Sequence, residues 1–140
     1  MASATALYTP RVLSLATSLA KWPWDETLPW HAQERSPTCG STLAIALGLT
    51  ANGEIENVAM RVHACAIGQA SAAIFAAAAH GLDRAALIAS EQALRDWLED
   101  GAPIPDWPHL SAIASARDFP ARRGAILLAW RAALAALPSG

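Results

Sequence analysis

Apolar residues alternate with small or polar ones over residues 41–50 and again over residues 55–64. Alternation with a period of two is typical of a β-strand with one buried face. Asn52-Gly53 stands between the two segments and strongly favours a tight hairpin turn. We therefore predict an antiparallel hairpin. The larger apolar side chains on its buried face would be Leu43, Ile45, Leu47, Leu49, Val58, Met60 and Val62.

The remaining apolar patterns indicate helices. Apolar residues recur at helical spacing from Tyr8 to Leu19, and an alanine-rich helix is expected over residues 66–80. Asp83 can cap a further helix that stops at Gly101, and a final helix is expected over residues 120–137. A short helix over residues 110–116 would precede the final one.

The order of these elements predicts an α+β fold, with a small antiparallel sheet packed against several helices in a single domain of residues 1–140. Residues 22–38 hold three prolines and three tryptophans, which excludes a long helix or a central strand there. Because a lone hairpin is only marginally stable, we expect a third strand from this segment.

Charge and hydropathy exclude some classes of partner. Ten basic and twelve acidic side chains give a net charge of -2, which offers no electrostatic surface for nucleic acid. The apolar runs over residues 66–79 and 125–137 are too short to span a membrane. Residues 12–20 fit an amphipathic helix better than a signal peptide. We expect a cytoplasmic protein with no membrane partner, in which cysteines are ligands or nucleophiles.

The hairpin brings the two cysteines together. If the turn is centred on Asn52-Gly53, residues whose numbers add up to 105 lie opposite each other, and Cys65 faces Gly40, the neighbour of Cys39. Cys65 also precedes a predicted helix, whose N-terminus stabilises a thiolate. Two adjacent thiolates suit zinc, iron or an iron–sulfur cluster, with His63 as the nearest further ligand. A disulfide, or two unrelated structural thiols, are the alternatives.

Several motifs resemble one family, the iron–sulfur cluster assembly scaffolds of the IscU, SufU and NifU N-terminal type. The resemblance extends over nearly the whole chain in the right order, and its C-terminal motifs are closer to the SufU-like branch. The segments that carry it are residues 7–8 (LY), 36–40 (SPTCG), 64–71 (ACAIGQAS), 119–122 (FPAR) and 128–130 (LAW).

The resemblance implies a protein that receives sulfur from a cysteine desulfurase, holds a transient iron–sulfur cluster or iron, and works with other assembly proteins. Zinc is a further option. Family members carry three cysteines and an aspartate just after the first Cys-Gly. Here Ser41 occupies the aspartate position and Ala125 the third cysteine position, so only Cys39 and Cys65 remain.

We therefore expect a scaffold-like protein, not an enzyme in the usual sense, that binds iron or a nascent cluster through Cys39 and Cys65, with His63 as an auxiliary ligand. Three forms of this function stay open. The site could be completed by a partner or a second subunit. A thiol could accept sulfur as a persulfide, as in a sulfurtransferase. The chain could also be a degenerate relative that binds assembly partners and regulates them.

Overall fold

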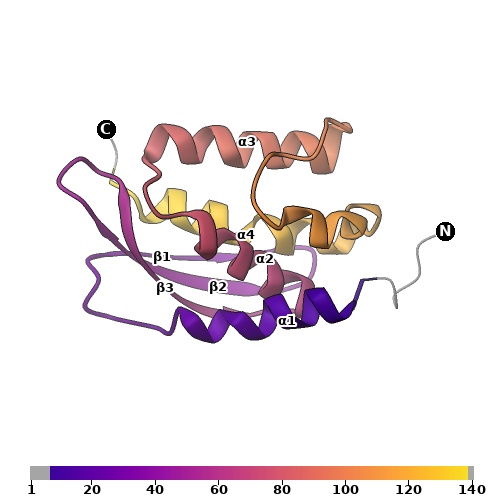
Figure 1. Ribbon diagram of the computed structural model, residues 1–140, viewed down its shortest axis with the longest axis horizontal. Coiled ribbons are helices and arrows are strands. Elements are labelled where there is room, and N and C mark those ends of the chain that lie inside the picture. Colours follow the sequence, from indigo (N-terminus) through magenta and orange to yellow (C-terminus); the bar gives the residue numbers. More distant parts are fainter. Residues whose placement is uncertain (1–6, 139–140) are drawn as a thin grey trace.

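The computed structural model describes residues 7–138 and confirms the predicted α+β fold (Figure 1). Residues 1–6 and 139–140 of the predicted domain lie outside the described residues. None of the described helices is long and apolar enough to cross a membrane. In chain order the elements are α1 (Pro10–Ser18), the 3₁₀ turn η2 (Leu19–Lys21), β1 (Trp30–Arg35), β2 (Thr42–Leu49), β3 (Ile55–His63), α2 (Ala66–Ala78), α3 (Arg84–Asp100), the 3₁₀ segment η3 (Leu110–Asp118) and α4 (Pro120–Ala136).

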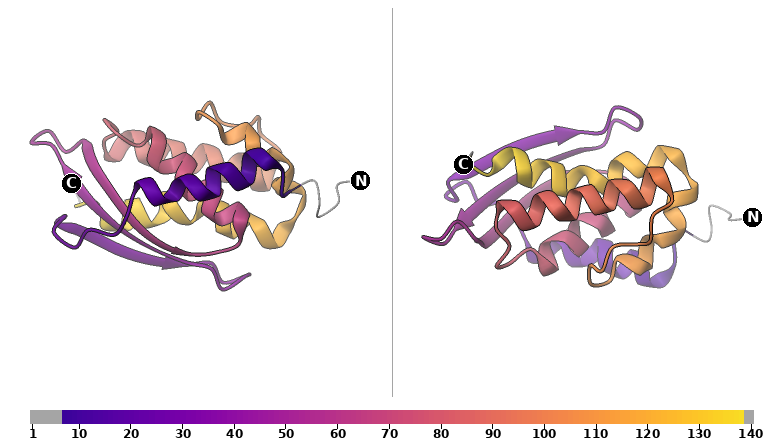
Figure 2. Two further views of the ribbon diagram at one scale, coloured as in Figure 1. Left: turned by 60° about the horizontal axis from the view of Figure 1, so that its bottom comes forward. Right: turned by 90° about the horizontal axis from the view of Figure 1, so that it is seen from above.

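The three strands form an antiparallel sheet in the order β1-β2-β3. The third strand, β1, comes from the proline-rich segment, as predicted, and it lies at an edge of the sheet. An edge tolerates flanking prolines because one side of the strand needs no ladder hydrogen bonds. Figure 2 shows that the helices cover one face of the curved sheet.

The hairpin register agrees with the sequence-based prediction. It results from two irregularities in the strand pairing, a shift at the turn and a bulge, whose effects on the register cancel. The turn is closed by Gly53 N–H donating to the Thr50 carbonyl, with Gly53 at a φ of 81°. This turn pairs Leu49 with Ile55, one residue out of the predicted register. A bulge at Gly48 and Leu49 then restores the register, so that Thr42 pairs with His63.

The core lies between the sheet and the helices. Helix α4 packs on β1 and β2, and α2 packs between α1 and α4, while α3 covers the outer side of α4. Phe75, Trp107 and Trp130 form an aromatic cluster with ring centroids 5.1 to 5.8 Å apart. The predicted caps are present, since Asp83 accepts a hydrogen bond from Ala86 N–H and Gly101 has a φ of 74°.

The opposite face of the sheet is partly covered by the loop between η2 and β1. Trp24 lies over this face, with its ring 4.6 Å from the Arg61 guanidinium and 5.4 Å from the His31 ring. On the central strand, Ala46 and Gly48 are buried on this side. The structure therefore corrects the expectation of a half-buried strand: β2 is covered on both faces, because small residues let the loop approach.

Candidate functional site

Cys39 lies in the tight loop that joins β1 to β2. The loop is closed by two backbone hydrogen bonds, from Ser36 N–H to the Ser41 carbonyl and from Gly40 N–H to the Ser36 carbonyl. Gly40 has a φ of 72°, which other residues rarely adopt. The Cys39 thiol is exposed, and its Sγ lies 3.1 Å from Ser41 Oγ. The loop therefore presents Cys39 to solvent on a fixed backbone.

The surroundings of Cys39 favour its anionic form. Burial raises the pKa of the Cys39 thiol, but hydrogen bonds from Ser36 and Ser41 and the nearby guanidinium of Arg122 outweigh this effect. The pKa of Cys39 therefore lies below its ordinary value. A thiol of this kind is a better nucleophile near neutral pH than an ordinary surface cysteine.

Cys65 lies between β3 and α2, at the end of the sheet where Cys39 is also found. It is the N-cap residue of α2, and its carbonyl accepts a hydrogen bond from Gln69 N–H. Its side chain is partly buried against the core. Thr42, at the start of β2, pairs with His63, at the end of β3. The loop with Cys39 and the loop with Cys65 therefore lie at the same end of these two neighbouring strands. The predicted convergence of Cys39 and Cys65 on one end of the hairpin is thus confirmed.

Arg122, in the first turn of α4, links the two thiols electrostatically. Its guanidinium donates a hydrogen bond of 3.2 Å to the Tyr8 hydroxyl. This bond, together with the charge of the Cys65 and Cys39 thiolates, raises the pKa of Arg122 above its ordinary value. Its Nε is buried and has no partner among the described residues. The site therefore combines two thiols with a guanidinium held by a tyrosine, and the Arg35 guanidinium also lies near the Cys39 loop, 3.8 Å from where a Cβ at Gly40 would be.

Helix α4 supports both cysteine loops through small residues. A side chain at Gly124 would collide with Ser36 Oγ, so the Cys39 loop rests directly on the α4 backbone there. At the next position, Ala125 is buried against Gly68, in the first turn of the helix that follows Cys65. Gly124 and Ala125 therefore fix the separation of the two loops.

The residues around Cys65 that carry the family motif have structural roles here. The Gln69 side chain donates to the Ala64 carbonyl, and the buried Ser71 hydroxyl donates to the Ile126 carbonyl of α4. A Cβ at Gly68 would lie 2.7 Å from Ala64 Cβ and 3.3 Å from Ala125 Cβ. The motif thus ties the Cys65 helix tightly against α4.

Gly68→Ala is expected to destabilise the protein. The added methyl must displace Ala64, whose Cβ cannot rotate away, and overpacking of this kind costs about 1–3 kcal/mol. The gain in helix propensity, about 1 kcal/mol, offsets only part of that cost. Urea unfolding would measure the loss. In an Ala64→Gly background the same substitution should become neutral or stabilising, and equal losses in both backgrounds would contradict the proposed collision.

Within residues 7–138, His63 is not grouped with both cysteines in a way that could hold a metal ion. Its prediction as a ligand assumes a strand pleat that continues to Cys65, but β3 ends at His63 and Cys65 already caps α2. No group of three or more His, Cys, Asp or Glu side chains within residues 7–138 is placed to hold a metal ion. A ligand role for His63 therefore stays a prediction.

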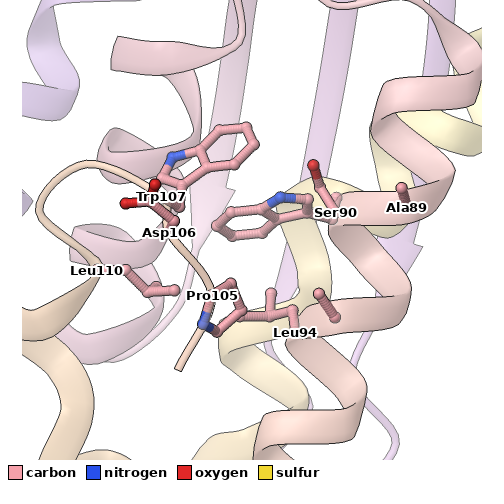
Figure 3. Close-up of a pocket in the computed structure, with 9 residues that line it drawn as sticks. Ala89, Ser90, Leu94, Pro105, Asp106, Trp107 and Leu110 are labelled. Carbon is pink, nitrogen blue, oxygen red and sulfur yellow. The ribbon is translucent and has the colours of Figure 1, made fainter. Parts of the chain in front are cut away.

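The pocket in Figure 3 lies apart from the cysteines, between α3 and the loop that precedes η3. It has a volume of about 250 Å³, and its apolar walls include the rings of Trp107 and Trp130. None of its lining residues carries a thiol, an imidazole or a positive charge, so it offers none of the groups that sulfur transfer uses. The lining residues are Ala89, Ser90, Ala93, Leu94, Pro105, Asp106, Trp107, Leu110 and Trp130.

Sequence reasoning missed the connection of Tyr8 and Arg122 to the thiols. Both residues belong to the motifs that carry the family resemblance, but they lie at opposite ends of the chain. Their contact depends on the packing of the segment before α1 near the start of α4, which no local pattern encodes. The only signal was the place of Arg122 three residues before the position of the missing third cysteine.

Comparison with solved structures identifies the fold family. The structure of a nitrogen-fixing NifU-like protein (N-terminal) from Brucella abortus is 28% identical, with a TM-score of 0.82 over 94% of this chain and 92% of that chain. A putative iron–sulfur cluster assembly scaffold protein for the SUF system from Fervidobacterium islandicum is 17% identical, with a TM-score of 0.83 over 97% and 100%. A hypothetical protein, 20% identical, has a TM-score of 0.67 over 89% and 95%.

These neighbours confirm the predicted resemblance. They do not separate its branches, so the SufU-like branch stays a prediction. No protein-family model matches the sequence, and no curated protein is significantly similar to it. The likeness is therefore carried by the fold and by a small number of motif residues.

Proposed function

We propose that this chain, which belongs to the IscU, SufU and NifU N-terminal family, acts in iron–sulfur cluster assembly by accepting sulfur on its pair of thiols. Cys39 is the first acceptor, because it is exposed and its pKa lies below the ordinary value. Cys65, which is partly buried at the same end of the sheet, assists as the second thiol. The donor is a protein persulfide, of the kind that a cysteine desulfurase carries.

The composition of the site supports this proposal. A structural or cluster-binding site usually needs four ligands, and the described residues bring no third His, Cys, Asp or Glu side chain to the two cysteines. Ser41 and Ala125 occupy the positions where the family carries ligands. Two thiols beside a guanidinium are suited to nucleophilic sulfur chemistry, which needs no bound metal.

The transfer step balances without an external oxidant or reductant. The Cys39 thiolate attacks the terminal sulfur of the donor persulfide, and a new S–S bond forms. The S–S bond of the donor breaks, and the donor cysteine leaves as a thiolate with the electron pair of that bond. This thiolate takes up a proton, which balances the proton that the Cys39 thiol released on ionisation. Cys39 then carries the persulfide.

Cys39→Ser is expected to abolish sulfur acceptance. After incubation with a persulfide-loaded cysteine desulfurase, mass spectrometry should find the wild-type chain heavier by one sulfur atom, with the modification on the peptide that contains Cys39. Cys65→Ser should retain part of this signal, because Cys39 is the more exposed thiol.

The same experiment with an alkylated desulfurase is the control, and it should leave the chain unmodified. If the wild-type chain gains no sulfur, or if Cys39→Ser gains as much as the wild type, the proposed acceptor function is wrong.

The second candidate is a scaffold that holds a cluster shared with another molecule, and the structural likeness to a putative cluster assembly scaffold favours it. Cys39 and Cys65 would then be two of the ligands, with His63 or groups of a partner supplying the others. In this case, anaerobic reconstitution with iron and sulfide should give a visible absorbance band that elutes with a dimer or a complex. A band in the monomer fraction would contradict this shared arrangement.

A further inference from the structure

Among residues 7–138, no carboxylate forms an ion pair with the Arg122 guanidinium of the site. Arg122 donates to the neutral hydroxyl of Tyr8, and its buried Nε has no partner among the described residues. The ion pair recorded within residues 7–138 joins Arg95 to Glu91 on α3, which leaves Arg122 without an acidic partner there. Ser41, at the position where the family has an aspartate, is also neutral.

An unbalanced guanidinium next to two thiols discriminates between ligands by charge. A nearby positive charge attracts anions and repels metal cations, and the effect is larger where the cation is partly withdrawn from water. Arg122 is partly buried, and its planar group offers several N–H donors in fixed directions. A site built in this way favours a sulfur species that carries negative charge.

We infer that Arg122, oriented by Tyr8, makes the two-thiol site selective for anionic sulfur, a persulfide or hydrosulfide group, over a metal cation. Arg122 is a positioning residue that receives the charge of the incoming sulfur while Cys39 reacts. This inference rests on the proposed acceptor function for its biological meaning, but the charge selectivity can be measured without a sulfur donor.

Tyr8 contributes by fixing the direction of the guanidinium. The tyrosine lies just before α1 and is partly buried against the core, while Arg122 starts α4. Their hydrogen bond therefore connects the N-terminal segment to the helix that supports both cysteine loops. Loss of the Tyr8 hydroxyl would leave the positive charge of Arg122 in place, but the guanidinium would no longer be held in one orientation.

The test compares two alkylating reagents that differ mainly in charge, iodoacetate and iodoacetamide. For each cysteine, peptide mass spectrometry gives the two rates, and their ratio cancels changes in the exposure of the thiol. Two unit charges about 8 Å apart in water attract by about 0.5 kcal/mol, enough to change a rate about twofold. We expect Arg122→Gln to lower the iodoacetate-to-iodoacetamide ratio about twofold at Cys39 and by at least as much at Cys65, whose charge acts more strongly on Arg122, and Tyr8→Phe to lower it by less.

Two variants serve as controls. Arg123→Gln removes the charge of the neighbouring arginine. The Arg123 guanidinium donates to the Arg117 carbonyl, so we expect this variant to leave the iodoacetate-to-iodoacetamide ratio nearly unchanged. Arg122→Lys should restore most of it. The wild-type ratio should also fall as salt is added, since screening is effective over about 8 Å at physiological ionic strength.

An equal ratio in the wild type and Arg122→Gln, or an effect of Arg123→Gln as large as that of Arg122→Gln, would overturn the inference. The outcome is independent of sulfur transfer. If the chain shows the charge preference but accepts no persulfide, the proposed function is wrong and the anion selectivity stands. If it accepts persulfide but shows no charge preference, the anion selectivity is wrong and the proposed function stands.

Discussion

The double substitution Ser41→Asp with Ala125→Cys is expected to turn the two-thiol site into one that retains a metal ion or cluster within a single chain. Ser41 Oγ lies 3.1 Å from Cys39 Sγ, so a carboxylate at this position would lie next to the first thiol. Ala125 packs against the start of the helix that follows Cys65. Four donors would then converge, the number that zinc and iron–sulfur clusters usually require.

Metal content after anaerobic purification, and absorbance after reconstitution with iron and sulfide, would measure this gain. At a free metal concentration one thousand times the dissociation constant, binding should also stabilise the fold by about 4 kcal/mol. Ser41→Asn with Ala125→Ser is the matched control, because the side chains are similar in size but are poor ligands. If both double variants retain equally little metal, the two positions do not explain the incomplete ligand set.

Trp130→Ala is expected to cause the largest loss of stability. The Trp130 side chain is 1% exposed, and its ring meets Phe75 and Trp107 at centroid distances of 5.2 and 5.1 Å in edge-to-face geometry. Removing a large buried aromatic side chain typically costs about 3–5 kcal/mol. The Trp107 ring would lose one of its two aromatic neighbours, so the loop before η3 should also loosen. Urea unfolding would measure the loss.

Trp30→Ala provides the control with the same chemical change at the surface. Trp30 is 37% exposed at the start of the edge strand β1, where most substitutions change stability by less than about 0.5 kcal/mol. Its loss should be a small fraction of that for Trp130→Ala. Comparable losses at the two sites would show that the aromatic cluster is not the principal support of the helical layer.

Local patterns in the sequence were sufficient for the elements, but less so for the faces they bury. Asp83 and Gly101 marked the bounds of α3 correctly, because caps act within one helical turn. The alternation in residues 41–50 identified the face of β2 toward the helices. It could not show that Trp24 covers the other face, since that contact depends on a loop with no periodicity.

The candidate site was predictable only where the hairpin determines it. The hairpin register alone was enough to predict that Cys39 and Cys65 lie at the same end, and that register follows from the Asn52-Gly53 turn. The contribution of Arg122 was not predictable in this way, because its contact with Tyr8 crosses nearly the whole chain. The same limit applies to the pairing of His63 with Cys65, because the strand pleat was extrapolated past His63, where β3 ends, to Cys65.

The paired irregularities of the hairpin set a rule for the length of the chain between the cysteines. The turn shifts the pairing by one residue and the bulge shifts it back, so Glu56 is an extra residue on β3 with no partner on β2. Deleting Glu56 alone would remove the bulge and leave the pairs from Gly48–Asn57 to Thr42–His63, and the faces of their side chains, unchanged. The hairpin can therefore lose this one residue and keep the thiol pair at one end, whereas a one-residue deletion within β2, which has no extra residue, would slip the ladder and send the side chains beyond it to the opposite face.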